Sequence, residues 1–377
     1  MSQLQAGQED LRYGGPEKAH HAVLDSPHDL RGFIELLSGV GKLVRVKETV
    51  DWKFEIGSRT RASQWPLLFE NIRDYPGQSV FTNGLRDLES IGLALGFSPG
   101  TRSKTIVSEC RKRLTAPVAP KLLPIPLHFK NIATGSQVDL TRFAVPQWSE
   151  FETARYIGTW HINVTRDPET GISNAGVYRM QVLSAAQATI SASHGSGLMR
   201  HLAKAERESR SLPAAVAIGV PEAVVVAGGA SCPPGMTEIE LAGALQQAPI
   251  EVFSSPVTKL EIPVSSEIIL EGSIAPNVRV QDGPYLDYCG VPTTNPRAVV
   301  FEVDRIMFRD HPVFRGSAIG ISGAEDHQLF AFLAQLNLVD FHGSRARQKL
   351  QNFLWKRRFF RALQWSGRAP GMLRKLS

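Results

Sequence analysis

Residues 160–183, WHINVTRDPETGISNAGVYRMQVL, decide the fold class of this chain. The segment 160–165 has the character of a short strand, and Arg166-Asp167-Pro168-Glu169-Thr170-Gly171 supplies a turn. A second strand is expected over 175–183. Further strands are expected at 214–218, 223–227, 250–253, 268–270 and 298–303. This succession of short strands and turns predicts a mostly β domain, a barrel or split barrel.

The segments before and after this region have a different pattern. Asp29 precedes apolar residues at 30, 33, 34 and 37, which predicts a capped helix. Residues 43–46 and 67–72 are expected strands, and 238–246 is an expected helix. The predicted fold class is α+β. We expect four parts: a flexible tail at 1–25, an N-terminal α/β domain at 26–125, a split-barrel-like domain at 126–325, and a short, basic, helical C-terminal segment at 326–377.

Composition excludes several classes of protein. The chain has 377 residues, of which 42% are hydrophobic and 21% charged, as in a globular protein with a sizeable core. No run approaches 18 apolar residues, so we expect no membrane span. The polar residues 1–25 lack the apolar core of a signal peptide, and three cysteines are too few for a disulfide framework. These features predict a cytoplasmic protein.

The net charge of +6 is concentrated near the C-terminus. Residues 344–377 contain ten Lys or Arg and no Asp or Glu, so the remainder of the chain carries −4. The high pI therefore does not indicate a nucleic-acid-binding surface, and we expect no nucleic acid partner. The basic segment is interpreted as a solvated or partner-docking helix face; binding of an anionic surface is the alternative.

Three segments carry residues that could take part in catalysis or ligand binding. Asn174 and Arg179 are five residues apart, so on an unbroken strand they would face opposite sides, and a bulge or bend is needed for both to meet one ligand. His194 lies in a Gly/Ser turn of the kind that approaches phosphates. Asp282 and Asp287 flank a turn, and paired acids support proton transfer. Each segment taken alone is better interpreted as ordinary strand or loop polar residues.

Taken together and in order, these segments resemble the UbiD family of reversible decarboxylases. The resemblance rests on 163–171 and 174–181, on Ser266-Glu267-Ile268-Ile269-Leu270-Glu271-Gly272, and on Asp282-Gly283-Pro284-Tyr285. The segments Asp29-Leu30-Arg31 and Leu68-Phe69-Glu70-Asn71 add to it. It covers roughly residues 28–330 and implies that 126–325 is a prenylated-FMN-binding domain.

The resemblance also implies the site. Cofactor-binding positions would be Asn174, Val177, Tyr178, Arg179, Ser193, His194 and Glu238. Of these, Asn174, His194 and Glu238 would hold Mn²⁺ beside the flavin phosphate, with K⁺ nearby; an amide oxygen, an imidazole and a carboxylate suit Mn²⁺. The catalytic set would be Arg179, Asp282 and Asp287. Many family members have Glu where this chain has Asp282.

The implied activity is non-oxidative, reversible decarboxylation of an aromatic or α,β-unsaturated carboxylic acid, with prenylated FMN as electron sink. Arg179 would position the carboxylate and Asp287 would donate the proton. A flavin prenyltransferase would supply the cofactor, and a homo-oligomer is expected. The C-terminal segment is shorter than in the family. The alternative is therefore a non-catalytic accessory subunit that assembles with a full-length relative.

Overall fold

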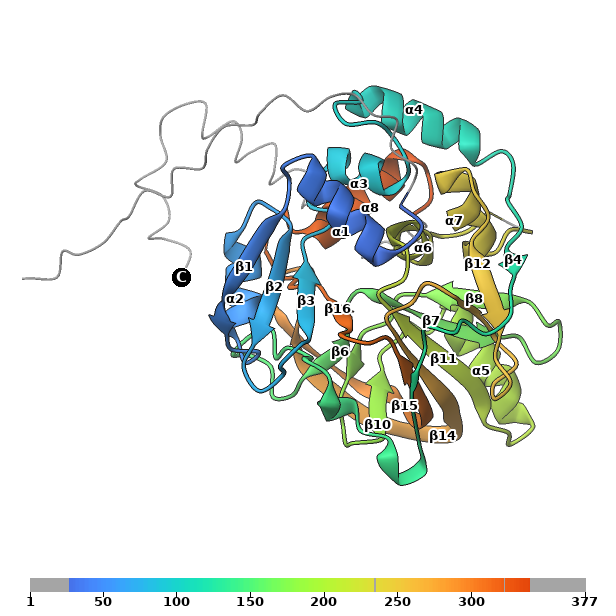
Figure 1. Cartoon of the computed structure of the whole chain (residues 1–377). Coiled ribbons are helices and arrows are strands. Elements are labelled where there is room, and N and C mark those ends of the chain that lie inside the picture. The colour runs from blue at the N-terminus through green and yellow to red at the C-terminus, as the bar shows by residue number, and fades with distance from the viewer. Residues whose placement is uncertain (1–26, 234, 322, 340–377) are drawn as a thin grey trace, which may run out of the picture.

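The computed structural model describes residues 27–233, 235–321 and 323–339. The fold has two main sheets and a group of helices (Figure 1). One sheet is curled and antiparallel, and the other is smaller, mixed and formed mainly by the N-terminal region. The expected tail at 1–25 and the basic residues after 339 lie outside the described residues. The α+β class is confirmed, and α8, Glu325–Gln335, is the described part of the helical C-terminal segment.

The curled sheet has seven strands, and all its pairings are antiparallel. Its order is β10-β15-β14-β11-β7-β8, with β5 also paired to β15. Register shifts interrupt the pairing of the two longest strands, and such irregularities bend a sheet into a half-barrel. The strands are β5 Asn131–Thr134, β7 His161–Arg166, β8 Ser173–Gly176, β10 Gln187–Ile190, β11 Leu212–Ile218, β14 Ile268–Leu286 and β15 Pro292–Phe308.

The N-terminal sheet has the order β1-β2-β3-β16 and mixes parallel and antiparallel pairs. Its strands are β1 Val44–Val50, β2 Leu67–Ile72, β3 Ser79–Thr82 and β16 Val313–Arg315. Two smaller sheets contain β4 Lys121–Leu122, β12 Glu251–Ser254 and β13 Glu261–Pro263, and β6 Tyr156–Gly158 with β9 Met180–Gln181. Because β16 pairs with β3, the chain returns to its N-terminal sheet after building the curled one.

The helices pack beside both sheets (Figure 1). Their bounds are α1 Leu30–Gly39, α2 Glu55–Ala62, α3 Leu88–Ala94, α4 Ser103–Arg113, α5 Gly197–Arg207, α6 Glu222–Gly228, α7 Glu238–Gln246 and α8 Glu325–Gln335, with short 3-10 turns at Gly135–Gln137 and Leu140–Arg142. Helix α1 follows the sequence prediction: the Asp29 side chain accepts a hydrogen bond from Gly32 N at 2.7 Å. Its apolar face, Leu30, Phe33, Ile34 and Leu37, is buried.

Two predicted strands are wrong in instructive ways. Residues 223–227 belong to helix α6, which begins after Pro221 and buries residues 222–227. A short, continuously buried apolar run has no periodicity, so sequence alone does not separate helix from strand. The expected strand 175–183 is two strands, β8 and β9, in different sheets. The break between Gly176 and Met180 provides the bend that Asn174 and Arg179 require.

A fully buried ion network joins four parts of the chain. Arg315, on β16, donates from Nε to Glu222 Oε1 at 2.6 Å and from Nη2 to Glu325 Oε2 at 2.7 Å. Glu222 begins α6 and Glu325 begins α8. The Glu325 carboxylate also accepts from the backbone N–H groups of Asn83 and Leu85, after β3. The network thus connects the N-terminal sheet to the helices beside the curled sheet.

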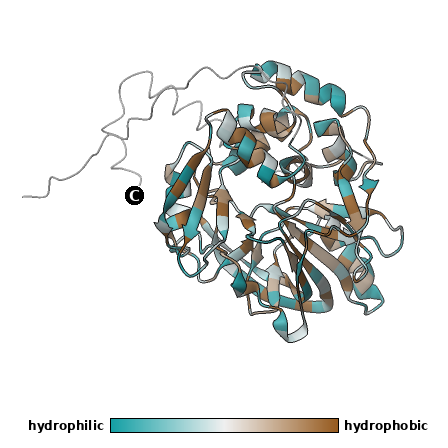
Figure 2. Ribbon diagram, viewed as in Figure 1, coloured by the Kyte–Doolittle hydropathy of each residue, from teal (hydrophilic) through white to brown (hydrophobic). Residues whose placement is uncertain are grey.

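Hydrophobic residues line the strands of both sheets, whereas the peripheral helix α4 is largely hydrophilic (Figure 2). Two large buried clusters make up the core, and each draws residues from before and after residue 126. None of the described helices is long and apolar enough to cross a membrane.

Candidate functional site

An ion pair between Arg179 and Asp282 lies at the centre of the candidate site. Arg179 follows the break after β8, and Asp282 lies on β14. The Nε and Nη2 atoms of Arg179 are 2.6 Å and 2.5 Å from Asp282 Oδ1. The Asp282 side chain is fully buried, whereas that of Arg179 is 16% exposed. Because a buried carboxylate requires a partner, Arg179 and Asp282 form one charge-paired unit.

Two threonines complete the hydrogen bonding of this pair. Thr189, on β10, donates from Oγ1 to Asp282 Oδ2 at 2.6 Å. Thr293, on β15, accepts at Oγ1 from Arg179 Nη1 at 3.0 Å. Both oxygens of Asp282 therefore accept hydrogen bonds, and the guanidinium is held on two sides.

Two buried tyrosines pack next to the guanidinium. The Tyr285 ring centroid is 5.1 Å from the Arg179 guanidinium carbon and 4.4 Å from the Tyr156 ring. Burial raises the pKa of both phenols above the ordinary value. Both tyrosines are therefore uncharged at neutral pH, and the electron-rich face of the Tyr285 ring attracts the Arg179 guanidinium.

Asp287 lies in the turn that follows β14. It is half-buried, and its Oδ1 accepts a hydrogen bond from Cys289 N at 2.7 Å. Within the described part of the chain, no hydrogen bond or ion pair joins it to Arg179 or Asp282. Helix α8 contacts the same turn, because His327 Nε2 lies 2.6 Å from Tyr288 O. The structure thus joins two members of the predicted catalytic set and places the third in an adjacent turn.

Asn174 and Glu238 lie next to each other around strand β8. Glu238, the first residue of α7, accepts at Oε2 from Ala175 N at 3.0 Å, directly after Asn174. Asn174 is buried against the first residue of α5, so closely that a Cβ on Gly197 would lie 1.7 Å from Asn174 Oδ1. Burial raises the pKa of Glu238, while the Ala175 N–H lowers it. An amide oxygen and a carboxylate are ligand types that a hard divalent cation prefers.

His194 and Ser193 are exposed in the turn that leads into α5. No contact joins His194 to Asn174 or Glu238 among the described residues. In that part of the chain, no group of three or more His, Cys, Asp or Glu side chains is placed to hold a metal, but the predicted set includes only two such residues. Tyr178 is closer to Asn174, whose Nδ2 donates to the Tyr178 hydroxyl at 3.4 Å. Val177 N donates to Gly228 O at the end of α6.

Sequence reasoning missed Thr189, Thr293 and Glu152. The two threonines lie in ordinary strand sequence, and only the fold brings them to Arg179 and Asp282. Glu152 is 3% exposed, and its Oε2 accepts from Trp148 N at 2.9 Å. Its Oε1 is buried and has no hydrogen-bond partner among the described residues. Burial raises its pKa to about 7. A buried acid before the expected strand gives no signal in the sequence alone.

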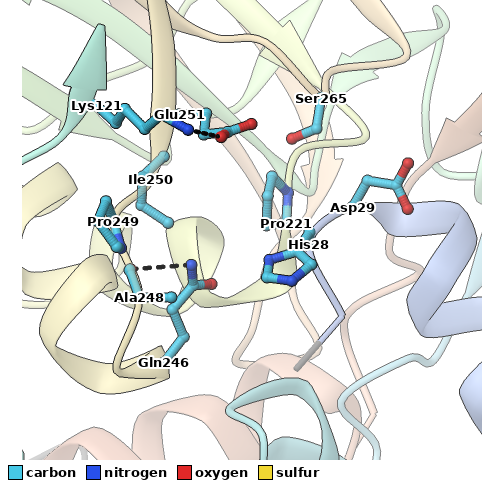
Figure 3. Close-up of a pocket in the computed structure, with 10 residues that line it drawn as sticks. All are labelled: His28, Asp29, Lys121, Pro221, Gln246, Ala248, Pro249, Ile250, Glu251 and Ser265. Carbon is cyan, nitrogen blue, oxygen red and sulfur yellow. Dashed lines mark hydrogen bonds and ion pairs between the residues drawn. The ribbon is translucent and has the colours of Figure 1, made fainter. Parts of the chain in front are cut away.

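A separate cavity of about 560 Å³ lies between α1, α7 and β12 (Figure 3). Gln246 points toward its interior, opposite His28, and an ion pair between Lys121 and Glu251 lies at its edge. Gln246 donates to Ala248 O at 3.2 Å, and its buried Oε1 has no partner within the part of the chain that the structure describes. None of the predicted catalytic, cofactor or metal residues lines this cavity.

Comparison with known proteins gives two family matches. Residues 123–322 match the 3-octaprenyl-4-hydroxybenzoate carboxy-lyase Rift-related domain, UbiD, and residues 34–110 match the N-terminal domain of the same carboxy-lyases. A pyrrole-2-carboxylic acid decarboxylase from Pseudomonas aeruginosa is 32% identical over 330 residues, covering 83% of this chain and 66% of the relative. A phenolic acid decarboxylase from Sedimentibacter hydroxybenzoicus is 32% identical over 321 residues, covering 80% and 66%.

Solved structures agree with these matches. A dimeric, evolved form of the UbiD-class enzyme HmfF from Pelotomaculum thermopropionicum, in complex with prFMN, has a TM-score of 0.75 and 29% identity, over 82% of this chain and 71% of that chain. The vanillic acid decarboxylase of Sedimentibacter hydroxybenzoicus in its closed form has a TM-score of 0.76 and 30% identity, over 80% and 66%. This chain spans 64% to 66% of the length of the curated relatives it matches.

Proposed function

Because this chain belongs to the UbiD family of carboxy-lyases, we propose that it catalyses non-oxidative, reversible decarboxylation of an aromatic or α,β-unsaturated carboxylic acid. The observation that carries the proposal is the ion pair between Arg179, whose side chain is 16% exposed, and the fully buried Asp282. The names of the relatives support aromatic and heteroaromatic acids as the substrate class.

Prenylated FMN, when bound, would supply the electron sink for the charge that remains on carbon when CO₂ leaves. The prFMN complex of a structural neighbour supports this cofactor. Val177, Tyr178, Ser193 and the metal-binding residues would bind it. Asn174 and Glu238, with His194 from the adjacent turn, would hold Mn²⁺, and K⁺ would bind nearby.

Arg179 would bind the substrate carboxylate through N–H groups that Asp282 and Thr293 do not use. Asp282 would keep the guanidinium in orientation and balance its charge while no substrate is bound. After the carbon–carboxylate bond breaks, Asp287 would give its proton to the carbon that lost CO₂. Because Asp287 is half-buried in a surface turn, it can then recover a proton from water.

The proposal also covers the cofactor supply, the oligomeric state and the location of the enzyme. A flavin prenyltransferase would supply the cofactor, and the chain would form a homo-oligomer. A cytoplasmic location is supported by the three cysteines, Cys110, Cys232 and Cys289, which are unpaired in the structure.

The test is purification from cells that co-express a flavin prenyltransferase, followed by visible absorption spectroscopy and a screen of aromatic acids for CO₂ release. We expect a bound flavin spectrum and release of CO₂ from at least one acid. Asp287→Asn should retain the flavin and lose on the order of 10²-fold or more in turnover, because its amide has no acidic proton. Asp304→Asn, an exposed carboxylate on β15, is the matched control.

Full turnover by Asp287→Asn would remove Asp287 from the mechanism. Flavin retention without CO₂ release from any acid, or no flavin retention at all, would contradict the proposed activity; the latter is what an accessory subunit predicts.

A further inference from the structure

We propose that Thr189 and Thr293 are positioning residues that fix the Arg179–Asp282 pair in a single orientation and leave one N–H on each terminal nitrogen of Arg179 for the substrate carboxylate. This inference rests on the proposed function for the identity of the ligand. The positioning itself rests on the geometry of four side chains from three strands and the segment after β8.

The direction of each threonine hydroxyl is determined by its neighbours. Gln181 N, which can only donate, lies 3.0 Å from Thr189 Oγ1. Thr189 must therefore accept from Gln181, and its own hydrogen is directed to Asp282 Oδ2 at 2.6 Å. In the same way, Thr293 accepts from Arg179 Nη1 at 3.0 Å and faces the carbonyl oxygen of Tyr285 at 3.5 Å.

These bonds account for three of the five N–H groups of Arg179. Nε and one hydrogen of Nη2 go to Asp282 Oδ1, and one hydrogen of Nη1 goes to Thr293. One N–H on Nη1 and one on Nη2 remain, and each can donate to a carboxylate oxygen. The Arg179 side chain is 16% exposed, whereas that of Asp282 is fully buried.

Thr189 matters because Asp282 is fully buried. Without the Thr189 hydroxyl, Oδ2 would have no donor, and a buried carboxylate oxygen without a donor is strongly disfavoured. Asp282 would then rotate or take up a proton, and either change would weaken its hydrogen bonds to Nε and Nη2 of Arg179. A free guanidinium binds a carboxylate less well, because it must be ordered at the moment of binding.

The experiment compares Thr189→Val, which has nearly the same shape but no hydroxyl, with Thr189→Ser, which keeps the hydroxyl. Thr82→Val is the control for loss of any buried threonine hydroxyl, since the Thr82 hydroxyl, on β3, is hydrogen-bonded to that of Thr60, on α2. Benzoate is the carboxylate probe, titrated calorimetrically into the flavin-loaded protein. A second readout is the ¹⁵N NMR resonance of Arg179 Nε–H, assigned by its loss in Arg179→Lys.

We expect Thr189→Val to bind benzoate about tenfold more weakly and to lose protection of the Nε–H from solvent exchange. Thr189→Ser and Thr82→Val should match the wild type in both. Thr293→Val, at a less buried position, is the second variant should Thr189→Val not fold; it should weaken benzoate binding severalfold and leave the Nε–H protected by Asp282.

Wild-type affinity for benzoate in Thr189→Val or in Thr293→Val would overturn the inference, and so would an Nε–H as protected in Thr189→Val as in the wild type. Failure of the wild type itself to bind benzoate would count against the proposed function and against carboxylate binding by the two remaining N–H groups of Arg179. The NMR readout would then still decide the positioning role of Thr189.

Discussion

Arg315→Met should destabilise this protein more than almost any other single substitution of a charged residue. The Arg315 side chain is fully buried and bridges Glu222 and Glu325 at 2.6 Å and 2.7 Å. Methionine has a similar length and fills the space, so the main effect is that two buried carboxylates lose their cation. Removing one partner of a buried ion pair costs about 3–5 kcal/mol, and here one cation serves two acids. We expect a loss of about 4 kcal/mol in the free energy of unfolding.

The loss should depend on pH with a defined sign. Burial raises the pKa of Glu222 and Arg315 lowers it, so removing Arg315 raises the folded-state pKa further. A group whose folded pKa is raised contributes stability below its unfolded pKa of about 4.3, and this contribution is lost as pH rises. The deficit of Arg315→Met should therefore be larger at pH 8 than at pH 5.

The assay is urea denaturation followed by tryptophan fluorescence at both pH values. Arg73→Met is the control: Arg73 forms an exposed pair with Asp51, and its loss should cost less than about 1 kcal/mol. A deficit for Arg315→Met below about 1 kcal/mol, or one that is equal at pH 5 and pH 8, would show that the buried network does not stabilise the fold as a charge-balanced unit.

Two further predictions concern acids near the site. Glu152→Gln should flatten the pH dependence of stability between pH 5 and 8, because burial raises the pKa of Glu152 to about 7. Ionisation of this buried carboxyl between pH 5 and pH 8 costs the wild type up to about 3 kcal/mol of stability. Denaturation curves at both pH values check this, and a pH dependence unchanged from the wild type would contradict it. Glu238→Gln should lower manganese and flavin content together, measured by mass spectrometry of metals and by absorbance, whereas Glu240→Gln, whose side chain caps α7, should retain both.

Sequence periodicity predicted the elements whose burial is one-sided. Helix α1 appears where expected because its apolar residues repeat at helical spacing and Asp29 caps its start. Strand β2 was predicted instead from its apolar run and the turn that follows it. Helix α6 was missed because it is buried on every side, which removes the period. The division into domains at 125 and 325 stays a prediction.

Some residues of the candidate site could be identified from the sequence, and others only from the fold. Arg179 and Asp282 were identifiable because they lie in motifs, and their contact is present in the structure. Thr189 and Thr293 were not, because each is an ordinary strand residue until β10, β14 and β15 align in the curled sheet. The roles of all the predicted site residues stay predictions, and among the described residues no contact joins Asp287 or His194 to its expected partners.

The pairing of β16 with β3 has a consequence for biosynthesis. Residue 313 pairs with residue 79, which leaves the ribosome 234 positions earlier. At usual translation rates the outer edge of β3 would wait roughly 10 to 50 s for its neighbour. During that interval the nascent chain presents an open strand edge, a surface that invites mispairing with other chains. Synthesis of this protein should therefore benefit from chaperones that shield the emerging N-terminal sheet until Arg315 arrives.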